Sequence, residues 1–477
     1  MILKGAISKP TRSLSDFGGV RVRGGDSGNP WAMVDSGMAE HYVNVDRDTP
    51  MLLPVDMRDW VPENDLVHFV ISAVDTMELG SVRVNTRGSG SKQYPPAMLL
   101  ALMIYCYANR LFSSRRIERS TYRDIAIRYL TGNTHPDHDT ICTFRRENGA
   151  LVKEAFAQVL RLAREMKLLK VGTVAVDGTH IKANASKHKS VRYDRAGELE
   201  QQLRQDIEEL LAQAEASDRE DRTDGQELPK EIARREQLRE RMLEARRQLQ
   251  AREKGQDETT AENEDKEEPP QSAGGGSKAT PEGSKQINLT DPESALMRKS
   301  RRDSYEQAYN AQAVVDAEGS QLILATDVIR TPSDANQLEP ALEKVTEAVG
   351  PVQCLLADGG YVNAEAIERV QQKVDLYVAI TSEDNNYRRY DYRPPKTRPA
   401  KKVVDPRLIA MREKVTSEEG KRIYGRRAAS VEPVFGIVKS AMGLRQFLLR
   451  GVAKVRIEWD LACLAYNMRR LWSLTTA

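Results

Sequence analysis

The sequence predicts an α/β protein, in which a mixed sheet with flanking helices follows an all-helical N-terminal region and is interrupted by a long helical insertion. Three observations predict this class. Short apolar strand patterns alternate with helical patterns after residue 286, and one more strand pattern lies near residue 175. Residues 51–169 carry apolar side chains at helical spacing. Residues 192–254 are charged, with Leu and Ile at every third or fourth position.

Composition predicts a soluble globular protein, because 40% of the residues are hydrophobic and 30% are charged. The longest apolar run, residues 97–108, is too short to span a bilayer and suits a buried helix. The cysteines, Cys106, Cys142, Cys354 and Cys463, are scattered without CxxC spacing. This pattern favours a reducing, cytoplasmic compartment and argues against structural zinc.

Charge is unevenly distributed along the chain, although the net charge is only +2. Residues 388–456 contain 19 Lys and Arg against 6 Asp and Glu, whereas residues 191–270 contain 15 against 24. A segment as basic as 388–456 indicates a polyanionic partner, most simply nucleic acid, or else a solvated surface.

The N-terminal third divides into two predicted parts. Residues 1–50 lack periodicity and are expected to be a disordered extension, and residues 51–169 are expected to form a helical domain. Its arginines, among them Arg145 and Arg146 on a helix that Asp139 would cap, suit a DNA-binding head as well as they suit an ordinary charged surface. The segment "HPDH" suits a turn better than a metal site, because no further ligand stands at metal-binding spacing.

The sheet domain is predicted to be discontinuous, with residues 170–190 and 286–475 as its two parts. Residues 191–254 between them are expected to form a helical hairpin or coiled coil, and residues 255–285 a low-complexity linker. After the linker, "YNAQAVVDAEG" and "SQLILATDVI" read as a β-hairpin.

Two predicted strands end in the same way, with "VAVDG" at Asp177 and "LLADGG" at Asp358. A bare carboxylate there implies a neutralising partner such as a metal, or a turn just beyond the strand. Glu432 lies in a predicted helix, on the same face as Lys439. If the three acidic groups meet, they repel one another unless cations lie between them, and two Mg²⁺ ions suit such an all-oxygen site.

Together these motifs resemble a known family. The order "VAVDGTHIKANAS", "YNAQAVVD", "LLADGGY" and "YGRRAASVEPVFGIVK" resembles the catalytic domain of bacterial insertion-sequence transposases of the DDE type. The segment "PDHDTICTFRREN" and the helices before it look like the N-terminal domain of the same transposases. The resemblance implies an RNase H-like fold, and it implies Asp177, Asp358 and Glu432 as a metal-binding triad for Mg²⁺, with Mn²⁺ as an alternative.

The resemblance also implies residues that contact DNA. Tyr424 and Lys439 match its last signature, in which either Arg426 or Arg427 fills the arginine position, and these side chains would hold phosphates near the scissile bond. Lys182 falls in another matching motif and is a further expected DNA contact. The remaining residues in matching motifs have less specific roles, with structural hydrogen bonding expected for the last two: His180, Asn310 and Gln312.

The function implied is DNA transposition. The resemblance implies cleavage at element ends and strand transfer by a homodimer that binds terminal inverted repeats and target DNA in a bacterial nucleoid. The alternatives are a nuclease of the same fold, a catalytically inactive or repurposed DNA-binding derivative, and a coiled-coil interaction protein. A phosphatase of the haloacid-dehalogenase type is excluded, because Ala175 stands where its nucleophilic aspartate is needed.

Overall fold

The computed structural model describes residues 56–83, 93–219, 228–261, 285–298, 303–380 and 403–476. All of them belong to one compact unit, Pro54–Ala477. The predicted extension 1–50 lies outside the described residues, as do residues 262–284 of the predicted linker and the basic loop 381–402. Among the described helices, none is both long enough and apolar enough to cross a membrane.

The N-terminal region is helical, as predicted. Its elements are η2 (Met57–Trp60), α1 (Leu66–Asp75), α2 (Pro96–Ala108), α3 (Ser114–Arg123), α4 (Ile125–Leu130), α5 (His138–Glu147) and α6 (Gly149–Glu165). Every residue of α2 from Leu99 to Ala108 is buried, which explains its continuous apolar sequence. The side chain of Asp137 caps α5 by accepting from Thr140 N at 2.6 Å, so the predicted cap, Asp139, lies two residues too late.

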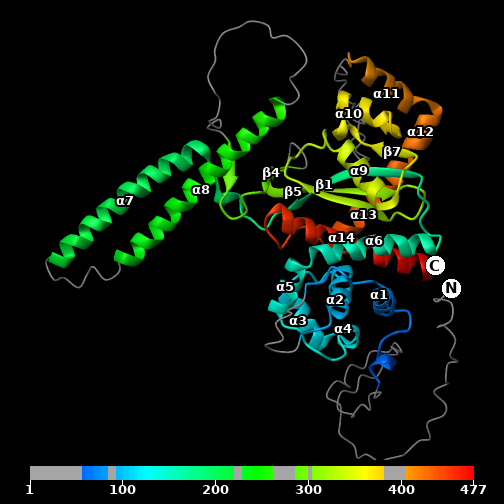
Figure 1. Cartoon of the computed structure of the whole chain (residues 1–477), viewed down its shortest axis with the longest axis horizontal. Helices are drawn as coiled ribbons and strands as arrows, with labels where there is room; N and C mark the ends of the chain where they lie inside the picture. The colour runs from blue at the N-terminus through cyan, green and yellow to red at the C-terminus, as the bar shows by residue number, and fades with distance from the viewer. Residues whose placement is uncertain are drawn as a thin grey trace, which may run out of the picture. The chain divides into compact units, whose positions relative to one another are not determined.

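A six-stranded mixed sheet forms the second half of the fold (Figure 1). Its strands are β1 (Thr173–Lys182), β4 (Ala295–Met297), β5 (Glu306–Asp316), β6 (Ile323–Ile329), β7 (Cys354–Ala357) and β8 (Asp375–Val378). The strand order is β4-β5-β1-β7-β8, with β6 also paired to β5. β5 runs antiparallel to β1, β4 and β6, whereas β1, β7 and β8 are parallel. The predicted hairpin is therefore β5–β6.

The remaining helices pack against this sheet or extend from it. They are α9 (Leu338–Val349), α10 (Ala364–Gln371), α11 (Pro406–Thr416), α12 (Glu418–Tyr424), α13 (Arg426–Gly436), the π-helix η6 (Ile437–Ala441) and α14 (Val452–Thr476). α13 contacts β1 and β5, which brings its residues to the middle of the sheet. A π-helical turn such as η6 is rare and is frequently found at functional sites.

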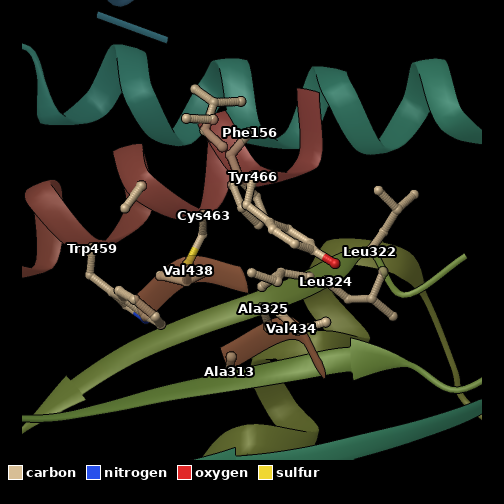
Figure 2. Close-up of a cluster of buried hydrophobic side chains, with 14 of the residues drawn as sticks. Phe156, Ala313, Leu322, Leu324, Ala325, Val434, Val438, Trp459, Cys463 and Tyr466 are labelled. Carbon is tan, nitrogen blue, oxygen red and sulfur yellow. The ribbon is translucent and has the colours of Figure 1, made fainter. Parts of the chain in front are cut away.

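One hydrophobic core joins the N-terminal helices to the sheet. α14 contacts α6 and α2 and also contacts β6. Figure 2 shows Phe156 of α6, Tyr466 of α14, Val438 of η6 and Ala313 of β5 gathered in this core. The helical region therefore contacts the sheet domain through α14.

The predicted insertion forms two helices that pack against each other (Figure 1). They are α7 (Tyr193–Arg219) and α8 (Leu228–Ala261), and at their base β2 (Ser190–Arg192) pairs with β3 (Gln286–Asn288). The insertion has its own small hydrophobic cluster, which includes Leu203, Met242 and Leu249. α8 continues beyond the predicted boundary at residue 254, because the single Gly255 costs a helix only about 1 kcal/mol.

Candidate active site

Asp177 lies inside β1 and not in a turn beyond it. It is paired with Ala313 of β5, and its Oδ1 accepts a hydrogen bond from Gly178 N at 2.8 Å. The parallel pairing of β1 with β7 ends one residue earlier, where Val176 faces Ala357. The carboxylate therefore stands at the position where β7 leaves β1, and this leaves room beside it.

Asp358 is the residue that directly follows β7, so it occupies the matching position on the neighbouring strand. Its side chain caps the 3-10 turn η5 (Gly359–Tyr361), with Oδ1 accepting from Gly360 N at 2.8 Å. A Cβ on Gly360 would lie 2.9 Å from that oxygen, so a larger residue would disturb the turn. In both Asp177 and Asp358, Oδ1 accepts a hydrogen bond from a backbone N–H, and Oδ2 can interact with another group.

That partner is Arg427 near the start of α13. Its Nη2 lies 2.9 Å from Asp177 Oδ2 and 3.6 Å from Asp358 Oδ2, and its Nη1 lies 3.7 Å from Glu432 Oε1. The Arg427 side chain is only 7% exposed, whereas that of Glu432 is 60% exposed. The three acidic residues predicted as a triad therefore meet around a single buried guanidinium.

Burial and charge together set the state of Asp177. The pKa of Asp177 is raised to about 7, because burial of the carboxyl group and the charge of Asp358 raise it by more than the Arg427 guanidinium lowers it. A carboxylate that is costly to ionise beside a second carboxylate needs a cation close by. Arg427 supplies one positive charge to the three acidic groups.

The oxygen donors fit a hard divalent cation. Carboxylate oxygens are the ligands that Mg²⁺ and Mn²⁺ prefer, and here three of them already face one buried cationic group, which stands in for a metal. In the part of the chain that the structure describes, no three acidic, His or Cys side chains are arranged closely enough to hold a metal as they stand. Movement of the guanidinium would therefore have to accompany binding.

The two candidate arginines, Arg426 and Arg427, point in different directions from α13. Arg426 points to the other side of α13, where its Nη1 lies 2.9 Å from Glu318 Oε1 and 3.3 Å from the hydroxyl of Thr173. Arg427 alone faces the triad. Neighbouring helix positions lie 100° apart, so the two arginines cannot share one surface of the helix.

Two clefts meet at this site. The first, of about 790 Å³, is lined by the triad and by Tyr424, Arg427 and Lys439. The second, of about 490 Å³, shares Lys439 and Ser440 with the first. The second cleft is lined further by Met297, Ser304 and Ala308 and by six ionisable side chains: His180, Lys182, Arg298, Arg445, Asp303 and Glu306.

Both lysines expected to contact DNA, Lys439 and Lys182, line these clefts. Lys439 is in η6, and its Nζ donates to the carbonyl oxygen of His180 at 2.9 Å. Lys182 at the end of β1 forms an ion pair with Glu306 at 2.6 Å. Both lie on the edge of the second cleft, so the expected DNA contacts on this side form one continuous surface.

Arg145 is not available to DNA in this arrangement. It is 5% exposed, and its Nη1 donates to Tyr107 Oη at 3.1 Å and to the carbonyl oxygen of Phe112 at 2.7 Å. The guanidinium supports the packing of α5 against α2. Arg146 is exposed and pairs with Glu147 at 3.0 Å. The burial of Arg145 could not be predicted, because the sequence pattern of a helix does not reveal which long side chains turn inward.

Sequence reasoning missed Asp334, in the loop between β6 and α9. Its Oδ1 accepts from Asn310 Nδ2 and from Gln312 Nε2, each at 2.6 Å. Its charge also raises the pKa of Asp177, although it is a lesser cause than burial and Asp358. Asp334 has no apolar strand directly before it, so only the fold could place it beside the triad.

Comparisons with known proteins agree with the resemblance drawn from the motifs. Residues 386–472 match a family model described as a transposase DDE domain, and residues 55–147 match one described as a transposase domain (DUF772). No curated protein and no solved structure matches the chain. The first match includes Glu432, Arg427 and Lys439, and the second includes α1 to α5. The chain therefore contains two regions that match transposase family models, which is consistent with an insertion-sequence transposase of the DDE type.

Proposed function

We propose that this protein is a DNA transposase that cuts the ends of an insertion sequence and joins them to target DNA, with Asp177, Asp358 and Glu432 as its catalytic and metal-binding residues. The observation that carries the proposal is the convergence of these three side chains, from β1, from the end of β7 and from α13, on one guanidinium. The RNase H-like assignment of the mixed sheet belongs to the same proposal.

The proposed reaction consists of two phosphoryl transfers in one site. In the first, a water oxygen attacks the scissile phosphorus and the bond to the 3′ oxygen breaks, which leaves a 3′-hydroxyl and a 5′-phosphate. In the second, that hydroxyl attacks a phosphorus of the target strand, and the target's own 3′ oxygen leaves. Two Mg²⁺ or Mn²⁺ ions held by the triad would supply charge neutralisation and a more acidic nucleophile.

The chain's own cations would hold the DNA backbone beside the triad. Lys439 stands where the two clefts meet, and Lys182, Arg298 and Arg445 line the second cleft, beyond the triad. Lysine and arginine bind phosphates, arginine in a bidentate manner. A strand whose scissile phosphate lies at Asp177 would therefore continue along the second cleft, over Lys439. Tyr424 lines the first cleft and is proposed as a further contact.

The N-terminal helices would bind the inverted repeats, and among them α3 offers the most suitable surface for contact with DNA. Its exposed arginines make no ion pair with any described residue: Arg115, Arg116, Arg119 and Arg123. Arg115 and Arg116 lie four and three positions before Arg119, and Arg123 lies four positions after it. Like charges at this spacing destabilise a helix, so a polyanion on this face would relieve the repulsion. In this proposal the arginines of α3 take the DNA-binding role that was expected of Arg145.

Two further parts of the proposal follow from the reaction. Both element ends must be held together, so the DNA complex is proposed to be a homodimer, with α7 and α8 as its candidate contact. A protein that acts on chromosomal DNA in bacteria works at the nucleoid, in the cytoplasm.

The full chain with MgCl₂ and a plasmid that carries both element ends tests this function. We expect cleavage at the ends and joining to a second plasmid, both abolished by EDTA. Binding to the ends without any cleavage would instead favour the alternative, a catalytically inactive or repurposed DNA-binding protein. Absence of both binding and cleavage would overturn the proposal.

A further inference from the structure

Asp334 belongs to a buried polar network that reaches the turn behind Asp358. Its Oδ1 takes both amide hydrogen bonds from β5, from Asn310 and from Gln312. Gln312 Oε1 in turn accepts a hydrogen bond from the hydroxyl of Tyr361. Asn310, Gln312 and Tyr361 are each 5% exposed or less, so water does not replace these bonds.

The hydrogen bonds of this network are consistent with one orientation of the Gln312 side-chain amide. The amide nitrogen of Gln312 donates to the Asp334 carboxylate and also to Asn310 Oδ1 at 3.0 Å, which leaves its amide oxygen toward Tyr361. If the amide were reversed, an oxygen would face a carboxylate and a nitrogen would face a hydroxyl donor. The charge of Asp334 therefore holds Gln312 in the orientation that accepts from Tyr361.

Tyr361 connects the network to the second aspartate of the triad. It is the last residue of the turn η5, which begins directly after Asp358 and which the Asp358 side chain caps. Tyr361 is fully buried, so its ring and hydroxyl fix the end of that turn. Gly178, next to Asp177, lies against the same network, because a Cβ there would be 2.7 Å from Asn310 Oδ1 and from Asp334 Oδ1.

The second oxygen of Asp334 faces the turn itself. A Cβ on Gly360 would lie 3.2 Å from Asp334 Oδ2 and 2.9 Å from Asp358 Oδ1, so the two carboxylates flank one glycine. Among the described residues no hydrogen-bond donor and no ion-pair partner reaches Oδ2 of Asp334. Arg427, which pairs with the three triad residues, makes no ion pair with Asp334.

We infer that Asp334 is a positioning residue of the active site. It holds Gln312 and, through it, Tyr361, so that Asp358 is presented to Asp177 at the spacing that a shared cation needs. This inference rests on the proposed function, because it assumes that Asp177 and Asp358 bind metal. Groups that orient metal ligands in this way typically change metal affinity by about 10–100-fold when they are removed.

Binding of Mn²⁺ to the DNA-free full chain, followed by electron paramagnetic resonance, tests the inference without any catalytic readout. We expect Asp334→Asn to weaken Mn²⁺ binding by about 10-fold or more. Cleavage by the variant should need a correspondingly higher MgCl₂ concentration, with the maximal rate largely restored at saturation. Tyr361→Phe removes only the bond to Gln312 and should shift metal affinity in the same direction by less.

Asp327→Asn is the matched control. Asp327 is a half-buried carboxylate on β6 that faces Gln312 across the strand pair, but it forms ion pairs with Lys344 and Arg456 outside the site. Its replacement should leave Mn²⁺ affinity unchanged. Wild-type Mn²⁺ affinity in folded Asp334→Asn, or, should that variant fail to fold, in Tyr361→Phe, would overturn the inference. Normal cleavage by Asp177→Asn would contradict the proposed function itself. Failure of the inference about Asp334 and failure of the proposed function would therefore give different results.

Discussion

Replacement of Asp177 by Asn is expected to lower the rate of Mg²⁺-dependent cleavage by about 10³-fold, while binding to duplex DNA stays largely intact. A metal that neutralises charge in the transition state contributes several kcal/mol, and each 1.36 kcal/mol is a factor of ten in rate. Asp177 is the most buried of the triad carboxylates, so its loss removes a ligand that water cannot replace without rearrangement. Gel-based cleavage assays and filter binding with the same labelled end fragment measure the two effects.

The fold of this variant is not expected to suffer. Asn has nearly the shape of Asp and can keep the hydrogen bond from Gly178 N, and it removes a charge that burial and Asp358 make costly. The melting temperature in EDTA at pH 8 should therefore equal or exceed that of the wild type. Asp327→Asn again serves as the control, with normal cleavage expected. A cleavage rate near the wild-type value in Asp177→Asn would refute its catalytic role.

Replacement of Arg427 by Met is expected to have the largest effect on stability. Removal of one partner from a buried ion pair typically costs about 3–5 kcal/mol, because the remaining charge stays buried and unpaired. Arg427 is 7% exposed and faces three acidic residues, so the metal-free variant keeps their mutual repulsion without a counter-ion. MgCl₂ should stabilise this variant more than it stabilises the wild type, since a divalent cation would replace the guanidinium.

The pH dependence of this variant has a definite sign. The pKa of Asp177 in the folded wild type is raised to about 7 from its usual 3.8. The folded state therefore keeps a proton that the unfolded state has released, so its contribution to stability is lost as pH rises from about 4 to about 7. Without Arg427 the pKa of Asp177 rises further, and the loss continues above pH 7. The deficit of the variant should be larger at pH 8 than at pH 5.

Thermal melts in EDTA at both pH values measure this effect, with Arg426→Met as the matched control. Arg426 is the neighbouring arginine, but it is 43% exposed and pairs with Glu318 at the surface. Its removal should cost no more than about 1 kcal/mol at either pH. Equal melting of Arg427→Met and Arg426→Met, with the same response to MgCl₂, would show that Arg427 is not the counter-ion of the triad.

The strand-end aspartates illustrate what the sequence could predict. In the sequence, Asp177 and Asp358 each follow an apolar stretch and precede glycine, and the carboxyl ends of neighbouring parallel strands lie at one edge of a sheet. Their proximity was therefore predictable. The continuation of β1 through Asp177 was not predictable, because the sequence pattern does not show where β7 ends relative to β1.

The residues that sequence reasoning placed less well depend on the phase of helices and the path of loops. Arg145 and the pair Arg426 and Arg427 lie on predicted helices, but only packing decides which side chain turns inward. Asp334 lies in a loop, and its place beside the triad depends on hydrogen bonds to β5 that no local pattern encodes. The mixed sheet and the helical insertion, by contrast, follow from periodicity that extends over many residues.

Crystals of the protein grown with MnCl₂ would show, by anomalous scattering, whether the acidic residues around Arg427 bind a divalent ion. We expect a manganese peak bound by Oδ2 of Asp177 and Oδ2 of Asp358, with the guanidinium of Arg427 moved away from its present contacts. A crystal in which Arg427 keeps those contacts and manganese binds elsewhere or not at all would contradict the central claim.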